Sequence, residues 1–440
     1  MIQENHISRR HWIPFVMGFL HFIIVCYILS SYFPLDANNP YYKKCSVHTP
    51  TETLTFIREG KYFIVSAYRD HREGRFIRVI SIINRDHLTT PLFCTFCCAQ
   101  ETVQATEAQV MFHSLYFGFT YAAAYVICPD QPSCNATHVK VIPYLQGGNP
   151  DLPYLPVQNK NIRDQSFPFD ITVCFSNVLG SVNNNVLQLI QSIELYKLLG
   201  VQKMFIYNNS CSPEVEKVLQ YYQKEHTLDI ISWPIDQYIQ SGTDWSFKGE
   251  VHNSGQLAVM NDCIYRNMDQ ARYVLLADLQ QIIVPYKHST LPLLLSELQK
   301  QHSDVTEFLF ETHVLPTSVS YDEGRFDLPE WRSVPGVNIL KHVYKIPVGP
   351  EDFLSTKMIV NPRAIKQTAV FYVIRKSGET LHVPNDMATV LQFSDVEIRG
   401  LGKENFTLDY RIWDFGNQLI PKINEVLQNV SEKVRRCCVM

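Results

Sequence analysis

The chain has 440 residues, of which 46% are hydrophobic and 19% are charged, and its formal net charge is -4. This length allows two or three domains, or one large α/β domain with additions, and the apolar content is enough for a folded core. The 39 Lys and Arg residues are scattered along the sequence, which excludes the basic stripe expected of a nucleic-acid-binding protein.

An apolar segment without charged side chains occupies residues 12–33, after the basic pair Arg9-Arg10. Its 22 residues are enough to cross a bilayer as a helix. The next charged residue after the segment is acidic, so residues 1–11 are expected in the cytosol and the body of the chain in a lumen. A cleaved signal peptide is the alternative, but the segment is long for one and is followed by a poor cleavage site. We therefore predict an uncleaved signal-anchor, followed by a polar stem in residues 34–50.

Residues 51–150 have the alternating pattern of β-strands. Apolar residues alternate with others in 61–68 and 75–83, and the polar link between these runs ends in Gly74, as a hairpin loop would. Shorter runs of the same kind follow at 92–96, 110–117 and 139–143. This part is predicted to be a small, cysteine-bearing β-rich module, with a linker rich in Gly and Pro at 147–153.

Nine cysteines lie between the anchor and the middle of the chain, which favours disulfides in an oxidising lumen. Cys94-x-x-Cys97-Cys98 could instead be half of a zinc site, but no second pair follows at the required spacing. Disulfides are therefore preferred, and their pairing is left open. Four Asn-x-Ser/Thr sequons indicate the same compartment, and the candidate glycosylation sites are Asn135, Asn208, Asn405 and Asn429.

From residue 165 to about residue 400 the pattern changes to alternating strands and helices. Short apolar strands are expected at 169–175, 201–207, 228–233, 273–279 and 307–311. Helices are expected at 184–199, from Ser212-Pro213 onward, at 254–268 and at 291–301. This succession predicts a mostly parallel sheet with flanking helices, which binds ligands at the C-terminal ends of its strands.

Residues 401–440 are predicted to be a C-terminal tail region. The last four residues, Cys437-Cys438-Val439-Met440, also fit a prenylation box, which is modified in the cytosol. The anchor, the sequons and the cysteines together outweigh that match. We therefore interpret the end of the chain as luminal, with two accessible thiols.

Several ordered motifs make the chain resemble glycosyltransferase family 92. They include Val173-Cys174-Phe175-Ser176, Trp233-Pro234, Gly255-Gln256, Asn261-Asp262-Cys263 with Arg266, Asp278 with Ile283-Val284-Pro285, and the segment Lys357–Arg363. Ser66-Ala67-Tyr68-Arg69-Asp70 resembles the module that precedes this domain in the family. The resemblance covers about 60–400 and implies an α/β fold of the GT-A-like (Rossmann-like) type in a Golgi type II membrane protein. It also implies transfer of a hexose with inversion, galactose from UDP-galactose in characterised members, usually with Mn²⁺.

Asp278 is the candidate metal ligand. The segment from Arg272 to Tyr286 predicts a buried strand that brings this carboxylate to its C-terminal end. There the carboxylate would hold a divalent cation against the donor's diphosphate, directly or through water. The alternative is a carboxylate that caps a turn.

The metal motif departs from the family pattern at this strand. The family usually has Asp-x-Asp-Glu where this chain has Asp278-Leu279-Gln280-Gln281, and often has His-Tyr-Arg where Gln392-Phe393-Ser394 align. Gln offers a carbonyl oxygen but no charge, so Mn²⁺ binding is expected to be weakened. His382 is a tentative second ligand that would replace the missing histidine, although a lone histidine is more often structural.

Three residues of the predicted helix 254–268 are candidate contacts of the UDP-sugar donor, namely Gln256, Asp262 and Arg266. Asp262 and Arg266 are four residues apart, so the alternative is that they pair with each other on one helix face. An inverting transfer also needs a base that takes the proton of the acceptor hydroxyl. Glu311 and Asp352 are the candidate catalytic bases, and the sequence does not choose between them.

These observations lead to two hypotheses of different classes. The first is a Golgi membrane glycosyltransferase with a luminal catalytic domain, a nucleotide-sugar donor, and a glycan or glycoprotein acceptor. The second is a non-catalytic luminal protein that keeps the fold and binds a glycan or a partner, since strand packing does not require the missing acids. A secreted disulfide-rich binding protein is a third hypothesis, and it requires cleavage of the anchor.

Overall fold

The computed structural model describes residues 48–437 apart from short internal segments. Those segments are 51, 58–60, 89–90, 99–100, 103–104, 131–133, 144–151, 160–165, 177, 181–183, 244–247, 322–323, 348–354 and 397–401. The predicted signal-anchor at 12–33 and the C-terminal residues 438–440 lie outside the described residues. No helix among the described residues combines the length and the apolar character needed to cross a bilayer.

The N-terminal part of the described chain belongs to a twelve-stranded sheet that encloses a core of its own. Its long strands β2 (Tyr62–Asp70), β3 (Phe76–Asn84) and β8 (Tyr121–Pro129) pair antiparallel, and the predicted hairpin 61–83 is present as β2 and β3. Its other early strands are β1 (Thr55–Ile57), β4 (Phe93–Cys98), β5 (Glu101–Thr102), β6 (Thr106–Glu107), β7 (Gln109–Phe112), β9 (Ala136–Ile142) and β10 (Leu155–Gln158).

Two short strands from much later in the chain complete this sheet. β14 (Ser241–Gly242) pairs with β15 (Val251–His252), and β15 pairs with β8 at Tyr121. The N-terminal module therefore contains strands that precede the predicted linker at 147–153 and strands that follow it.

Disulfides cross-link the module. Cys94–Cys128 joins β4 to β8, and Cys98–Cys134 joins β4 to the residues just before β9. Cys97 is disulfide-bonded as well. The Cys94-x-x-Cys97-Cys98 motif thus forms disulfides, as predicted, rather than half of a zinc site.

A nine-stranded sheet carries the predicted α/β region. Its strands lie in the order β13-β12-β11-β16-β20-β18-β24-β17, with β23 beside β18. Their bounds are β11 (Phe169–Phe175), β12 (Lys203–Asn208), β13 (Leu228–Ser232), β16 (Ala271–Ala277), β17 (Gln281–Pro285), β18 (Val305–Pro316), β20 (Thr356–Val360), β23 (Glu379–His382) and β24 (Ala388–Ser394).

This sheet is mixed, which corrects the prediction of a mostly parallel one. β13, β12, β11 and β16 are parallel, because helical crossovers connect them in sequence. β20 then enters antiparallel between β16 and β18, and β17 pairs antiparallel with β24. The apolar pattern that predicts a strand carries no information about this later pairing.

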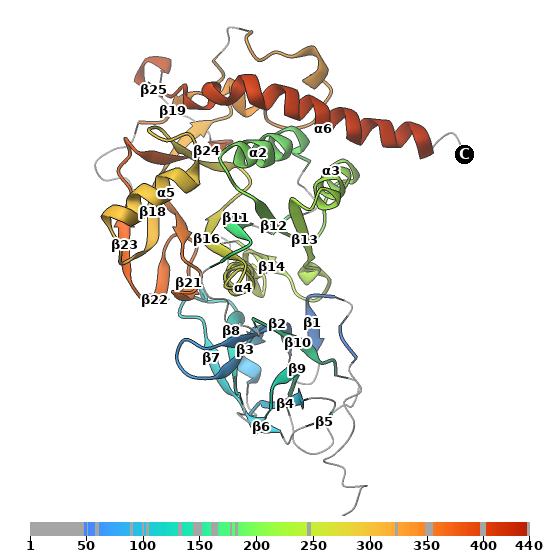
Figure 1. Ribbon diagram of the computed structural model, residues 1–440. Coiled ribbons are helices and arrows are strands. Elements are labelled where there is room, and N and C mark those ends of the chain that lie inside the picture. The colour runs from blue at the N-terminus through green and yellow to red at the C-terminus, as the bar shows by residue number, and fades with distance from the viewer. Residues whose placement is uncertain are drawn as a thin grey trace, which may run out of the picture.

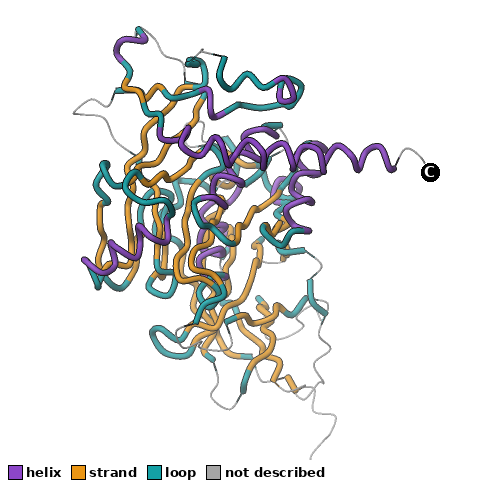
Figure 2. The backbone as a smooth tube through the Cα atoms, turned by 45° about the horizontal axis from the view of Figure 1, so that its top comes forward, coloured by secondary structure: helices purple, strands orange, loops and turns teal. Residues whose placement is uncertain are grey.

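Helices cover both faces of the nine-stranded sheet (Figure 1). On one face lie α2 (Val186–Leu198), α3 (Pro213–Lys224), α5 (Leu291–Gln301) and α6 (Gly416–Cys437). On the other face, α4 (Gln256–Arg266) lies between the sheet and the N-terminal module. In Figure 2 the strands of the module form a separate group at the bottom, and α6 runs outward to the C-terminus.

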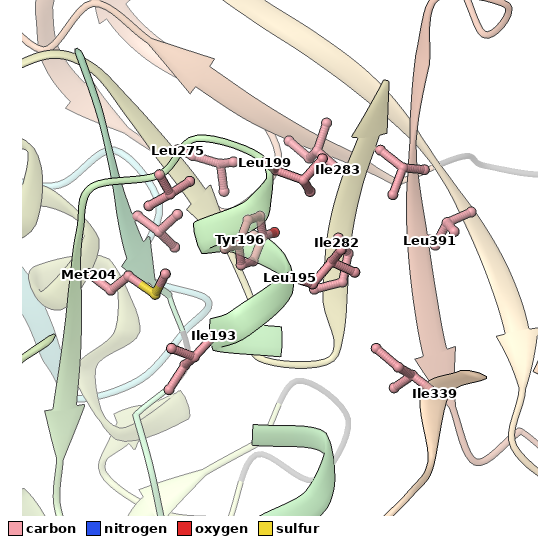
Figure 3. Packing of buried hydrophobic residues seen from close by; sticks show 14 of the residues in the cluster. Ile193, Leu195, Tyr196, Leu199, Met204, Leu275, Ile282, Ile283, Ile339 and Leu391 are labelled. Carbon is pink, nitrogen blue, oxygen red and sulfur yellow. The ribbon is translucent and has the colours of Figure 1, made fainter. Parts of the chain in front are cut away.

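Helix α2 fills the space between the parallel strands and the β17–β24 pair. Figure 3 shows its Leu195 and Tyr196 among buried residues of four strands, namely Met204, Leu275, Ile282, Ile283 and Leu391. The Tyr196 hydroxyl donates to the Gln281 carbonyl oxygen at 2.7 Å. This contact fixes the start of β17 against the helix, and with it the chain that follows Asp278.

The region predicted as a tail, 401–440, contains α6. Leu419, Ile423 and Val426 of this helix are buried in the same core as α2 and α3. Two separate pairs of short strands lie outside the two large sheets: β19 (Tyr344–Lys345) with β25 (Thr407–Leu408), and β21 (Ile365–Thr368) with β22 (Val373–Lys376).

Candidate active site

Asp278 lies at the carboxyl end of a buried strand, as the sequence predicts. β16 ends at Ala277, and Asp278 follows it with 8% of its surface exposed. The segment 272–286 is two strands rather than one, because the chain turns after Asp278 and returns as β17. The carboxylate is thereby held at the edge where sheets of this kind bind ligands.

Side chains from the two strands that flank β16 bind the Asp278 carboxylate. The hydroxyl of Ser176, which follows β11, donates to Oδ1. The Nζ of Lys357 in β20 lies 3.2 Å from Oδ2, and this lysine is 1% exposed. Because β11 and β20 both pair with β16, the sheet itself brings these three residues together. The carboxylate is therefore matched by a buried positive charge.

The glutamines that depart from the family pattern lie next to Asp278, and two of them contact each other. Gln281 accepts a hydrogen bond from the Asp278 backbone N–H through Oε1 at 3.0 Å, and its Nε2 donates to Gln392 Oε1 at 2.9 Å. Gln281 and Gln392 are opposite each other in the β17–β24 ladder. Gln280 is exposed, and its carbonyl oxygen accepts from the Phe393 backbone N–H at 2.9 Å.

A hard divalent cation would need several free anionic or carbonyl oxygens at this edge. Asp278 is a single carboxylate there, Gln281 Oε1 is already bonded to the Asp278 backbone N–H, and the Lys357 ammonium occupies the position of a cation beside the carboxylate. The described residues contain no group of three or more His, Cys, Asp or Glu side chains that could hold a metal. The residues present therefore do not fit the expected Mn²⁺.

His382 does not lie beside Asp278. It is exposed in β23, and β18 and β20 separate that strand from β16. At about 4.8 Å per strand, the separation between the two strands is roughly 14 Å. The position aligned with the family's histidine is instead held by Gln392, whose side chain bonds Gln281.

Asp262 and Arg266 pair with each other inside the protein. Arg266 Nη2 lies 2.9 Å from Asp262 Oδ2, and the Asp262 side chain is completely buried. Asp262 also accepts hydrogen bonds from Tyr207 of β12 at 2.5 Å, from Tyr68 of β2 at 2.7 Å, and from Ser66 of β2. This carboxylate therefore joins α4 to both the nine-stranded sheet and the N-terminal module.

The charge state of Asp262 follows from these contacts. Burial alone would raise the pKa of its carboxyl, but the charge of Arg266 and the hydroxyl donors outweigh burial and lower the pKa. Asp262 is thus an ionised group whose partners all belong to the protein. The geometry matches the internal pairing considered from the sequence, and it explains why Ser66 and Tyr68 accompany Asp262 among the motif residues.

Gln256 is buried at the first turn of α4. The three preceding residues, Asn253, Ser254 and Gly255, all have positive φ, which turns the chain sharply into the helix. A Cβ on Gly255 would approach Ile82 Cδ1 to 2.8 Å, so this position requires glycine. Trp233 Nε1 donates to the Ser254 carbonyl oxygen at 2.8 Å and holds the turn.

Of the two candidate bases, Glu311 lies within the described residues and Asp352 lies outside them. The Glu311 side chain in β18 is 29% exposed, and its Oε1 lies 3.4 Å from His313 Nε2. Burial, reinforced by the charge of Lys345, lowers the pKa of His313. The imidazole is therefore neutral near pH 7 and can hydrogen-bond to the Glu311 carboxylate.

The sequons differ in accessibility. Asn135, Asn405 and Asn429 are exposed. Asn208 is half-buried at the end of β12, and its Nδ2 contacts Cys211 Sγ at 3.6 Å. The first three asparagines can therefore present an acceptor amide to solvent more readily than the fourth.

Three residues that contact the predicted site are assigned no role from the sequence, namely Ser176, Lys357 and Gln392. The first two belong to motifs that carry the family resemblance, which is the signal that could have identified them. Their contacts with Asp278 depend on the pairing of β16 with β11 and β20, which is not visible in the local sequence.

Comparison with known proteins adds two findings. A family model described as glycosyltransferase family 92 matches residues 169–434. The chain is also 25% identical over 244 residues to a protein of Caenorhabditis elegans named beta-1,4-galactosyltransferase galt-1. That alignment covers 53% of each protein, so the chain spans about half the length of this relative.

Proposed function

The chain belongs to glycosyltransferase family 92, and we propose that it transfers a hexose, galactose from UDP-galactose, to a glycan with inversion at the anomeric carbon. The name of the similar Caenorhabditis elegans protein supports galactose as the sugar. The observation that carries the proposal is the carboxylate of Asp278 at the carboxyl end of β16, bonded to Ser176 and Lys357 from the flanking strands.

Lys357 supplies positive charge at this edge without a metal. Its Nζ lies 3.2 Å from Asp278 Oδ2, which holds the ammonium in position. The leaving diphosphate gains negative charge as the glycosidic bond to it breaks, and a fixed positive group nearby stabilises that charge. An ionised carboxylate can accept about four hydrogen bonds, so Asp278 retains capacity for donor hydroxyl groups beside Ser176 and Lys357.

Glu311 is the base that we assign. In a single displacement, the acceptor hydroxyl oxygen forms a bond to the anomeric carbon while the bond from that carbon to the diphosphate oxygen breaks. UDP leaves with the electron pair of that bond, and the hydroxyl proton passes to the Glu311 carboxylate. The neutral His313 beside Glu311 orients the carboxylate through its 3.4 Å contact.

We also propose the Golgi membrane as the location, with the signal-anchor at 12–33 and the described region in the lumen. The disulfides Cys94–Cys128, Cys98–Cys134 and Cys174–Cys263 support an oxidising compartment. The last of these joins β11 to α4, so the α/β region contains a disulfide as well as the module.

The test is turnover of UDP-galactose by the purified full chain, measured as hydrolysis and as transfer to a mixture of glycans, with Mn²⁺ and with EDTA. Turnover is expected under both conditions. Lys357→Met should lower kcat by about 10²–10³-fold, because the leaving diphosphate loses its positive partner. Lys422→Met, which removes an exposed lysine of α6, is the control and should leave kcat unchanged.

A non-catalytic glycan-binding protein is the second candidate. The observation that favours it is that the side chains at the metal position bind each other. Gln281 is hydrogen-bonded to Gln392, and Lys357 forms an ion pair with Asp278. Absence of turnover in both Mn²⁺ and EDTA, from protein that keeps its folded circular dichroism spectrum, would exclude the transferase and favour this candidate.

A further inference from the structure

A separate cleft of about 700 Å³ lies on the half of the sheet formed by β17, β24 and β18. This volume is within the usual range of ligand sites, about 300–1,000 Å³. β19 and β25, which border it, lie at the end of the molecule farthest from the N-terminal module (Figure 1). The side chains on which the argument depends are Tyr286, His313, Asn385, Leu408, Asp409 and Tyr410.

The charges around the cleft are paired within the protein. Lys345 lies 2.5 Å from Asp409, and Arg411 lies 2.7 Å from Asp414. The Asp386 carboxylate at the rim is 2.5 Å from Lys287. A nucleotide diphosphate needs positive charge that is not already paired within the protein. The described residues that line the cleft offer no such charge, so the cleft suits an uncharged ligand.

The lining of the cleft combines polar groups with exposed apolar ones. Tyr410 is 39% exposed and Leu408 is 47% exposed, and the Tyr410 ring is packed on Trp413 at a centroid distance of 4.7 Å. Asn385, which is exposed, also lines the cleft. A sugar ring has hydroxyl groups at its edge and C–H groups on its faces, which match amide and hydroxyl partners beside a supported aromatic ring.

The cleft is connected to the base assigned above. His313 lines it, and the His313 Nε2 lies 3.4 Å from Glu311 Oε1. A ligand that fills the cleft therefore contacts the imidazole that orients this carboxylate. Such a ligand would have one end at the position where an acceptor hydroxyl loses its proton.

We propose that this cleft binds the acceptor glycan, and that the acceptor is a neutral oligosaccharide whose ring stacks on Tyr410. The word acceptor rests on the proposed transferase function, whereas the binding of a neutral oligosaccharide rests on the cleft alone.

The test is binding of fluorescently labelled neutral N- and O-glycans, released from glycoproteins, to the purified full chain, followed by titration of the tightest binder. Their sialylated counterparts serve as the charged comparison. Tyr410→Ala should weaken binding about tenfold, which corresponds to about 1.4 kcal/mol. Asn385→Trp should block the cleft from an exposed position that the fold tolerates. Tyr116→Ala removes a tyrosine that is 40% exposed elsewhere and should leave binding unchanged.

Binding of neutral glycans that both cleft variants weaken would support the proposal. Absence of binding, a preference for the sialylated glycans, or binding that Tyr410→Ala and Asn385→Trp leave unchanged would overturn it. UDP-galactose hydrolysis without acceptor is measured separately on the unaltered chain. Glycan binding localised to the cleft in a chain that shows neither hydrolysis of UDP-galactose nor transfer to the bound glycan would contradict the transferase and still support a glycan site.

The chain's own sequon provides one more control, because Thr407 of Asn405-Phe406-Thr407 lines the cleft. Asn405→Gln removes any glycan attached there. Equal binding with and without this substitution would support the acceptor assignment. Binding that appears only in Asn405→Gln would mean that the chain's own glycan occupies the cleft, and it would overturn the assignment.

Discussion

Asp262 in α4 and Asp278 after β16 are both buried carboxylates beside a cation, but they differ in what remains available to a ligand. Asp262 accepts five hydrogen bonds, two from Arg266 and one each from Ser66, Tyr68 and Tyr207. Asp278 accepts two from side chains of the described residues, Ser176 and Lys357. An ionised carboxylate offers about four acceptor positions.

This comparison separates a structural carboxylate from one that can serve a ligand. The partners of Asp262 come from α4, β12 and β2, so they join the nine-stranded sheet to the N-terminal module and fill its acceptor positions. Asp278 lies at a strand end, keeps acceptor positions free of side-chain partners within the described residues, and has 8% of its surface exposed. Residue type and burial alone do not distinguish the two.

The largest expected difference is in stability. Asp262→Asn leaves the partly buried guanidinium of Arg266 without its counter-charge and removes the anionic acceptor of three buried hydroxyl groups, so it should cost about 3–5 kcal/mol. Asp278→Asn should cost less, about 1–2 kcal/mol, because Asp278 accepts two hydrogen bonds from side chains whereas Asp262 accepts five. Urea unfolding followed by tryptophan fluorescence compares the two variants. Equal losses, or a larger loss for Asp278→Asn, would contradict the distinction.

Acid unfolding provides a second comparison, of intermediate size. Burial raises the pKa of Asp70, but hydrogen bonds and charges from Arg72 and Arg78 outweigh it and lower the pKa to about 2. The unfolded chain therefore binds more protons than the folded chain between about pH 4 and pH 2, and stability falls as pH falls through that window. The total loss in the free energy of unfolding from protonation of Asp70 is roughly 2 kcal/mol.

Asp70→Asn is the variant that measures this contribution. It should lower the unfolding free energy by roughly 2 kcal/mol at pH 5, and the difference from the unaltered chain should vanish towards pH 2. Urea titrations at several pH values give both curves. A difference that stays constant from pH 5 to pH 2 would mean that Asp70 does not act through its charge.

The smallest expected effect concerns the metal position. The triple variant Gln280→Asp, Gln281→Glu and Gln392→His supplies the anionic and imidazole ligands that the family pattern implies. UDP should then bind at least about tenfold more tightly with Mn²⁺ than with EDTA, a gain of about 1.4 kcal/mol or more. Calorimetric titration with UDP measures this gain. No gain would mean that these side chains do not face the donor.

Much of the fold can be predicted from the sequence because its signals are local. The start of α3 is an example, since Ser212 caps the helix by accepting from the Val215 backbone N–H at 3.3 Å and Pro213 follows it. The antiparallel entry of β20 and the return of β14 and β15 to the module could not be predicted. These pairings join residues that are far apart in the chain and have no local signature.

At the site, too, the features with a local sequence signal can be predicted and the contacts between distant strands cannot. The position of Asp278 at a strand end could be predicted from the apolar run before it. Its partner Lys357 could not, because the contact depends on β20 lying next to β16. The role of Asp262 needed the structure as well, since its hydroxyl partners Ser66 and Tyr68 belong to the N-terminal module.

The most direct test of the claim that Lys357 replaces a metal at the donor site is a calorimetric titration of the purified full chain with UDP in EDTA, repeated on Lys357→Met. UDP should bind the unaltered chain in EDTA with an affinity that Mn²⁺ does not change. Lys357→Met should bind it at least about tenfold more weakly. Binding that requires Mn²⁺, or that Lys357→Met leaves unchanged, would contradict the claim.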